Sequence, residues 1–193
     1  MLENIKGKKV ILASKSPRRH FLLGELGLDF EIVENHDVEE DYPPDMQPEE
    51  ITVYLAKKKA AEFSGIISQD TLLITADTIV WCEGSILNKP RDREDAFRIL
   101  KKLSGNRHTV FTGVCIRSPQ KVVTFYATTD VYFSTLAEEE IEHYLKEYKP
   151  YDKAGAYGIQ EWIGYIGIEK IDGSYFNVMG LPIQKLYQEL KKF

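Results

Sequence analysis

The chain has 193 residues, which is enough to bury a substantial hydrophobic core, and we expect a single domain over residues 1–193. Its 30 acidic and 25 basic side chains give a net charge of −5, which argues against nucleic acid as a partner because proteins that bind duplexes usually carry a basic surplus. Cys82 and Cys115 fit no disulfide framework, and no apolar run approaches the roughly 18 residues of a membrane span, so we expect a cytoplasmic protein without a membrane partner.

Short strands and helices alternate in the first part of the sequence. The apolar run before Ser14 predicts a strand, and Ser16 followed by Pro17 predicts the N-cap and first turn of a helix. Gly27 is a typical helix stop. The predicted elements are a strand over 10–13, a helix from Pro17 to Gly27, a strand over 30–33, an acidic loop over 37–48 and a helix over 49–63.

The second part of the sequence begins with a hairpin. Residues 71–82 form a long β-type run, Glu83-Gly84 is a turn signal, and residues 85–88 provide the partner strand. Asp92 begins a helix that ends at Ser104-Gly105. Strands are then predicted over 109–117 and 122–133, a helix with a Thr135–Glu138 capping box, two strands joined by Asp172-Gly173, and a last helix over 182–192.

Two hydroxyls and two guanidinium groups gather at the start of the first predicted helix, in residues 14–19 (SKSPRR). The amino end of a helix is already positive, so Arg18 and Arg19 cost electrostatic energy there unless an anion neutralises them. The segment therefore predicts a phosphate or carboxylate site. A solvated arginine pair on an ordinary capped helix is the alternative.

Asp77 interrupts a run that is otherwise suited to a buried strand, and a buried carboxylate without a partner would be costly. It needs a lysine, an arginine or a metal, and a structural ion pair is one interpretation. A two-residue turn would pair Thr78 with Lys89, so the Lys89 ammonium would lie about one residue position from Asp77 along the hairpin. A slip of one residue in the register would turn it to the other face.

Lys59 and Glu39 are weaker candidates. Lys59 continues the helical stripe of Ile51 and Leu55, so its side chain is expected to face the protein, although a lysine at such a position often extends its ammonium to solvent. Glu39 belongs to an acidic cluster of the kind that is usually solvated. Common phosphate-loop, dinucleotide, nucleophile-elbow and zinc-helix motifs are absent from the sequence, so a hard ion such as Mg²⁺ or Mn²⁺ suits these carboxylates best.

Five blocks of the sequence resemble the Maf family of nucleoside triphosphate pyrophosphatases in their order and spacing. They are residues 12–19 (LASKSPRR), 76–78 (ADT), 89–92 (KPRD), 152–160 (DKAGAYGIQ) and 173–175 (GSY). The resemblance implies an α/β fold like that of inosine triphosphatase, in which a long curved mixed sheet with flanking helices separates two lobes around a deep cleft. It also implies a homodimer.

The resemblance further implies a role for each candidate residue. Ser14, Arg18 and Arg19 would hold the triphosphate, and Lys59 and Lys89 would reach it from other walls of the cleft. Glu39 and Asp77 would position the metal and the attacking water, with Asp77 as proton acceptor. Arg18, Thr78 and Gln160 would set the substrate preference. Residues 156–160 (AYGIQ) are similar to the branch that acts on dTTP and UTP. The alternatives are the branch that acts on 7-methyl-GTP and a non-catalytic nucleotide-binding regulator of septum formation.

Gln160 offers a physical reason for that preference. Its amide has one acceptor and two donors, so it matches the N3–H and a carbonyl of uracil or thymine, whereas cytosine reverses both positions. We therefore expect hydrolysis of dTTP and UTP, including modified pyrimidine triphosphates, to the monophosphate and pyrophosphate. This would be a nucleotide-pool sanitising activity. A glutamine that contacts no ligand is the alternative.

Overall fold

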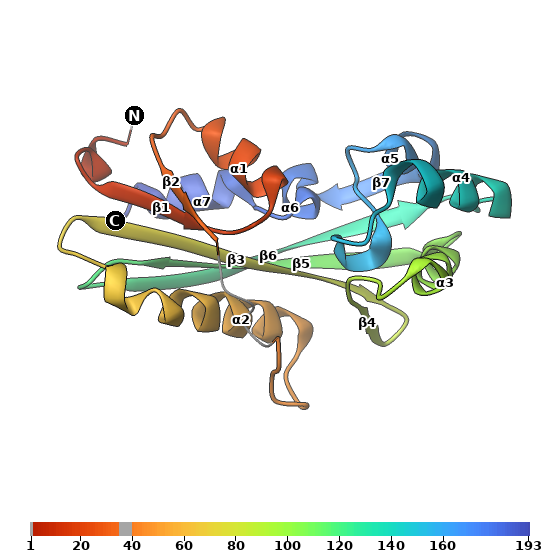
Figure 1. Ribbon diagram of the computed structural model, residues 1–193, viewed down its shortest axis with the longest axis horizontal. Coiled ribbons are helices and arrows are strands. Elements are labelled where there is room, and N and C mark those ends of the chain that lie inside the picture. Colours follow the sequence, from red (N-terminus) through yellow and green to blue (C-terminus); the bar gives the residue numbers. More distant parts are fainter. Residues whose placement is uncertain (1, 35–39) are drawn as a thin grey trace. The chain divides into compact units, whose positions relative to one another are not determined.

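The structure is a computed structural model that describes residues 2–34 and 40–193 (Figure 1). Its contacts divide the chain into two compact units. Unit 1 consists of Met1–Asp77, Thr112–Ala127 and Gly180–Phe193, and unit 2 consists of Thr78–Phe111 and Thr128–Met179. The single domain, the two lobes and the cleft expected from the sequence stay predictions.

Seven strands form one mixed sheet within the described residues, with the order β2-β1-β3-β5-β6-β7 and β4 paired to β3. β1 is parallel to both β2 and β3, whereas β4 is antiparallel to β3 and β7 is antiparallel to β6. This arrangement confirms the mixed α/β class. The strands are β1 Lys9–Ala13, β2 Glu31–Val33, β3 Thr71–Cys82, β4 Ser85–Leu87, β5 Arg107–Arg117, β6 Val122–Phe133 and β7 Ile168–Gly173.

Helices flank these strands (Figure 1). They are α1 Pro17–Gly24, α2 Pro48–Glu62, α3 Arg93–Leu103, α4 Glu138–Tyr148, α5 Trp162–Gly167, α6 Tyr175–Met179 and α7 Ile183–Leu190, with the short 3₁₀ helices η1 Glu3–Ile5, η2 Ser64–Ile66 and η3 Ala154–Ala156. In the described part of the chain, no helix combines the length and the apolar character that crossing a membrane requires.

In unit 1, α2 packs closely on the strands, and Figure 1 shows it on the opposite side of them from α1. The Thr75 hydroxyl of β3 donates a hydrogen bond to the carbonyl of Ala56 at 2.7 Å. Gly113 of β5 lies directly against the backbone of Thr52 and Val53, with no room for a Cβ. This close packing fixes the position of α2 on the strands. The core between them contains Ile11, Ala13, Ala56, Ala60, Phe63, Leu73 and Cys115.

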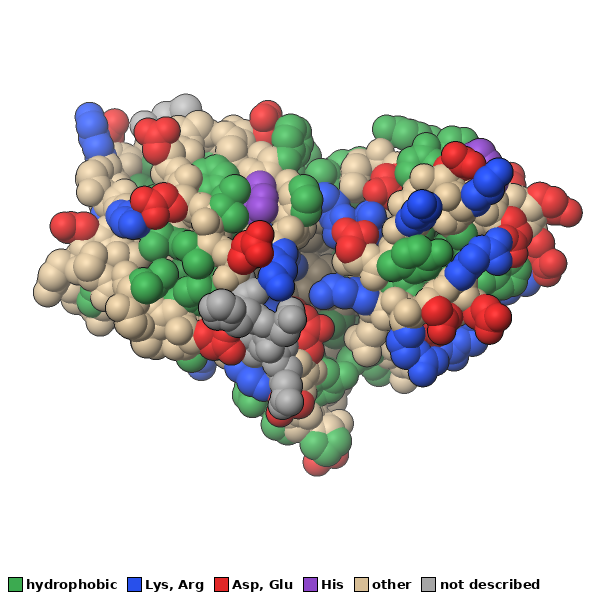
Figure 2. Space-filling view, viewed as in Figure 1, with side chains coloured by type: hydrophobic (Ala, Val, Ile, Leu, Met, Phe, Trp, Pro, Cys, Tyr) green, Lys and Arg blue, Asp and Glu red, His purple; other side chains and the backbone are tan. Residues whose placement is uncertain are grey.

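In unit 2, α3 and α4 are joined by charged side chains. Lys101 pairs with Glu138 at 2.8 Å, and Arg93 pairs with Glu142. Figure 2 shows acidic and basic side chains interspersed over this part of unit 2 on the face that it draws. Surface ion pairs contribute little each, so the apolar side of the helices supplies most of the stability. Ile99, Leu100 and Leu103 of α3 and Ile141, Tyr144 and Leu145 of α4 are buried.

The hairpin and the start of α3 confirm the predictions. β3 has the expected bounds, and Glu83 and Gly84 both have positive φ, 46° and 75°, which is the conformation of a two-residue type I′ turn. Val80 pairs with Leu87, which is the predicted register, although β4 ends before Lys89. The Asp92 carboxylate caps α3 by accepting from the Asp95 N–H at 2.8 Å.

Three predicted boundaries were wrong. α1 ends at Gly24, and Gly27 lies in the turn that follows. α4 has Ala137 as its N-cap, because the Leu136 N–H is already bonded to the Ser104 side chain at 2.7 Å and the chain stays extended through that point. Asp172 and Gly173 pair with β6 as part of β7, and α6 follows instead of another strand.

Candidate functional site

The turn between β1 and α1 is fixed by Ser14, which is buried. Its N–H donates to the carbonyl of Val33 at 3.1 Å, and its hydroxyl accepts from the N–H of Ser16 at 3.1 Å. Its carbonyl lies 2.7 Å from Nε2 of His20. Ser16 is the N-cap and Pro17 the first residue of α1, as predicted, although the Ser16 side chain makes no capping hydrogen bond. The turn therefore sets the direction in which the two arginines leave the helix.

Arg19 is held by two backbone carbonyls. Its Nε donates to Gly180 and its Nη1 to Ala76, each at 2.7 Å. Burial lowers the pKa of Arg19, the nearby charge of Asp77 raises it, and the charge of Arg18 lowers it again. Both guanidinium groups thus lie within electrostatic range of each other, and one is fixed beside Asp77. An anion at this point would relieve the repulsion between them.

Lys59 and Asp77 form a buried ion pair in unit 1. Lys59 Nζ lies 2.5 Å from Asp77 Oδ1, and the two side chains are only 11% and 7% exposed. Lys59 therefore faces the protein, as the helical stripe predicts. The same ammonium donates to Glu40 Oε1 at 3.0 Å. Two carboxylates and one ammonium thus converge on one point near Arg19.

Glu40 is a residue that sequence reasoning missed. Glu39, which was predicted to share the metal with Asp77, lies outside the described residues. Its neighbour Glu40 contacts Lys59, whereas the sequence offered no way to tell apart the members of the acidic cluster. Which acid reaches Lys59 depends on the path of the chain before α2, and a run of three acidic residues contains no signal for that path.

The remaining candidates belong to unit 2. Thr78 is half-buried in β3, and Lys89 is exposed after the end of β4. Gln160 is half-buried, but its Oε1 atom is fully buried and makes no hydrogen bond to any of the residues that the structure describes. A buried amide oxygen without a donor is destabilising by about 1–3 kcal/mol. A ligand that carries a donor would satisfy this atom; His108 Nδ1 and Asn177 Oδ1 are likewise buried atoms that make no hydrogen bond to the described residues.

The carboxylates of unit 1 suit a hard divalent cation. Mg²⁺ is usually bound by one or two protein carboxylates together with phosphate oxygens and water, and Asp77 and Glu40 provide two carboxylates, both of which contact the Lys59 ammonium in this structure. Across residues 2–34 and 40–193, no group of three or more His, Cys, Asp or Glu side chains is arranged to hold a metal by itself. Phosphate oxygens of a substrate and water would complete the coordination of a metal at this site.

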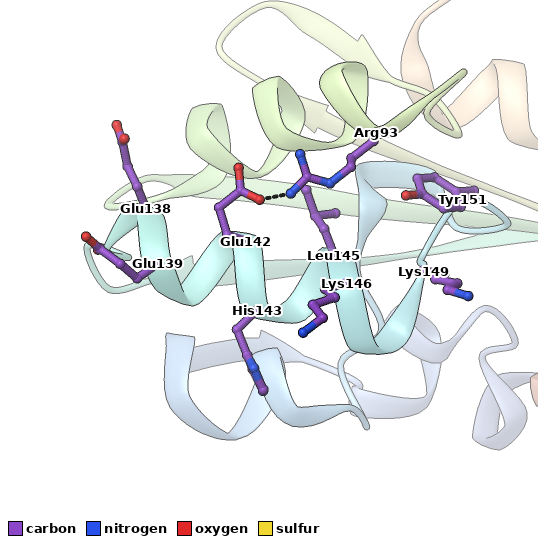
Figure 3. Close-up of a pocket in the computed structure, with 9 residues that line it drawn as sticks. All are labelled: Arg93, Glu138, Glu139, Glu142, His143, Leu145, Lys146, Lys149 and Tyr151. Carbon is purple, nitrogen blue, oxygen red and sulfur yellow. Dashed lines mark hydrogen bonds and ion pairs between the residues drawn. The ribbon is translucent and has the colours of Figure 1, made fainter.

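An open pocket in unit 2 lies along α4 and is separate from every predicted residue (Figure 3). Figure 3 shows the ion pair between Arg93 and Glu142 on its wall. Lys146 and Lys149 lie on the same stretch of chain as Glu138 and Glu139. Because acidic and basic groups are mixed there, the pocket offers no uniform charge that would select an anion, and we assign it no role in the chemistry.

Comparison with known proteins identifies relatives over the whole chain. A profile of the family described as Maf-like protein matches residues 9–193. Proteins named dTTP/UTP pyrophosphatase are 54% identical over 193 residues in Parabacteroides distasonis and 53% identical over 192 residues in Bacteroides fragilis, with 100% of both chains covered. The protein of that name in Porphyromonas gingivalis is 51% identical over 195 residues, covering 100% of this chain and 98% of the relative.

Solved structures give more distant matches. The structure of a HAM1 protein from Coxiella burnetii is 13% identical, with a TM-score of 0.49 over 96% of this chain and 100% of that chain. The match of the family profile from β1 to the last residue, together with identities above one half over full-length relatives, is decisive. This chain belongs to the Maf family.

Proposed function

We propose that this protein hydrolyses dTTP and UTP to the corresponding monophosphate and pyrophosphate. The observation that carries the proposal is the buried ion pair of Lys59 and Asp77, with the more exposed Glu40 on the same ammonium and Arg19 nearby. The names of the three relatives supply the substrate class and favour dTTP and UTP over 7-methyl-GTP. A regulator that only binds nucleotides needs cations, whereas hydrolysis also needs an acid to orient water, and Asp77 supports the enzyme.

The reaction joins a water oxygen to the α-phosphorus and breaks the bond from that phosphorus to the bridging oxygen of the β-phosphate. The electron pair leaves with pyrophosphate, and the proton of the water passes to a base, for which we propose Asp77. Phosphoryl transfer depends mostly on positioning and on neutralising charge. Arg18, Arg19 and Lys59 would supply positive charge around the phosphates, as would Lys89.

A divalent metal, Mg²⁺ or Mn²⁺, would be held by Asp77 together with an acid of the 39–40 pair and phosphate oxygens of the substrate. When bound, it would neutralise charge on the phosphates and lower the barrier to displacement. Lys59 has a separate role in this proposal. Because it contacts both carboxylates, it would hold them close to each other although their charges repel.

Hydrolysis of UTP in ¹⁸O-labelled water tests the site of attack. Attack at the α-phosphorus places the label in UMP, and we expect labelled UMP with unlabelled pyrophosphate in a one-to-one ratio. The reaction should stop in excess chelator and resume when Mg²⁺ is restored. Release of UDP and inorganic phosphate would contradict the proposed cleavage, and full activity in chelator would remove the metal from it.

A further inference from the structure

Gln160 lies in a tight turn of unit 2. The N–H of Glu161 donates to the carbonyl of Gly158 at 3.0 Å, so Ile159 and Gln160 occupy the two central positions. The side-chain oxygen of Gln160 is one of three buried side-chain atoms that make no hydrogen bond to any described residue, and the other two belong to His108 and Asn177. The position of this side chain therefore depends on the contacts that hold the backbone of the turn in place.

Tyr144 of α4 contacts both ends of the turn. Its hydroxyl accepts from the N–H of Gly158 at 3.0 Å and donates to Oε2 of Glu161. The ring is fully buried. Burial raises the pKa of Tyr144, and the hydrogen bond to Glu161 raises it further, so the hydroxyl keeps the proton that it donates. A single hydroxyl thus links the start and the end of the Gln160 turn.

Glu161 is itself held from the other side. Its Oε1 lies 3.2 Å from Nζ of Lys153, whose side chain is only 9% exposed and also pairs with Asp152 at 2.7 Å. The carboxylate lies over Gly158 so closely that a Cβ at that position would touch it. Each oxygen of Glu161 therefore has its own partner, Tyr144 for one and Lys153 for the other.

We propose that Tyr144 and Glu161 are positioning residues that fix the Gln160 turn and so set the discrimination between uracil or thymine and other bases. This inference rests on the proposed function. An amide discriminates between bases only if its backbone holds it at hydrogen-bond distance from the edge of the ring, and a fixed turn provides that position. Neither residue needs to touch the substrate for this effect.

The test compares Tyr144→Phe with Tyr148→Phe. Tyr148 is the matched control because its ring stacks on Tyr144 with centroids 5.1 Å apart, one turn along α4, while its hydroxyl is no part of the network. We expect Tyr144→Phe to lower the ratio of kcat/KM for UTP over CTP by about tenfold, because a buried hydrogen-bond network is broken. The control should keep the wild-type ratio.

Two further measurements separate positioning from general damage. In Tyr144→Phe the KM for UTP should rise while kcat stays within about twofold, and inhibition by inorganic tripolyphosphate, which has no base, should not change. Glu161→Gln provides a second variant, which keeps the shape of the side chain but loses the charge that pairs with Lys153. It should lower the same ratio in the same direction.

The inference is overturned if the folded variants keep the wild-type ratio, or if they lose affinity for tripolyphosphate as strongly as for UTP. The second result would mean that the network supports the whole site. If the wild type itself does not prefer UTP over CTP, the proposed function fails together with this inference. A preference in the wild type that Gln160→Glu removes and Tyr144→Phe leaves intact would contradict the inference alone.

Discussion

Asp77 provides the sharpest test at the scale of single residues. Asp77→Asn keeps the shape of the side chain, but the amide cannot take a proton and, being neutral, is a much weaker metal ligand than a carboxylate, so we expect kcat to fall by at least about 100-fold. The fold should survive because Lys59 keeps its second partner, Glu40, at 3.0 Å. Pyrophosphate release and thermal unfolding, measured on the same sample, check both parts.

Asp41→Asn is the matched control for this substitution. Asp41 is exposed and pairs with Lys58, so its change also replaces a paired carboxylate with an amide, but on the surface. It should change both kcat and stability very little. Near wild-type release of pyrophosphate by folded Asp77→Asn would remove Asp77 from its proposed role.

The sequence identified Asp77 and Lys59 as candidates but did not identify them as partners. Each stands out locally, one as an acid in an apolar strand and the other as a cation on an apolar stripe. Their contact joins residues that are 18 positions apart and depends on how α2 packs on β3. The register of the hairpin directed attention to Lys89 instead, because a local pattern predicts only the contacts of neighbouring elements. The missing donor of Gln160 Oε1 likewise emerges only from the folded turn.

The approach of α2 to β5 can be tested at the scale of elements. Gly113→Ala places a methyl group against the backbone of Thr52 and Val53. Neither backbone segment can move away without shifting the whole of β5 or α2. We expect a loss of about 1–3 kcal/mol in the free energy of unfolding, as is typical of overpacking. Urea denaturation measures it. Gly65→Ala is the control, because a Cβ at Gly65 meets open space and should leave stability nearly unchanged; equal stability of the two variants would contradict the close approach.

Elements with strong local signals were predicted well. β3 matches the sequence expectation because a long apolar run and a two-residue turn define both of its ends. Errors occurred where a distant partner decides the boundary. The start of α4 depends on Ser104, which lies 32 residues before Leu136. The chain after Gly173 turns into α6 because Ser174 bonds to Thr129 at 3.0 Å, and no local pattern reveals that contact.

Stability of the whole molecule should depend on the protonation of His108. Burial lowers the pKa of His108 to about 4, and its Nε2 lies 2.7 Å from the Tyr157 hydroxyl between the rings of Phe133 and Tyr157. The unfolded chain binds a proton near the ordinary value of 6.5. At a pH between these two pKa values, unfolding therefore takes up a proton at His108. The stability that neutral His108 contributes is complete above about pH 6.5 and is lost as the pH falls toward 4.

Urea denaturation at pH 7 and at pH 5 measures this effect, which should lower the free energy of unfolding by about 2 kcal/mol at the lower pH. His108→Gln has no titrating group at this position. Its stability should change less between the two pH values, whatever its absolute stability. Equal pH dependence in the variant and the wild type would contradict a neutral, buried His108. The homodimer expected from the family resemblance stays a prediction at this scale.

The central claim is that the site selects uracil and thymine triphosphates, and the most direct measurement is kcat/KM for pyrophosphate release from dTTP, UTP, CTP and 7-methyl-GTP. A site whose buried amide is left unpaired by the wrong base loses about 1–3 kcal/mol per group. We therefore predict that dTTP and UTP exceed the other two by at least about tenfold. Gln160→Glu should reduce activity on dTTP and UTP much more than it reduces affinity for tripolyphosphate. Equal efficiency of the wild type on all four nucleotides would contradict the account.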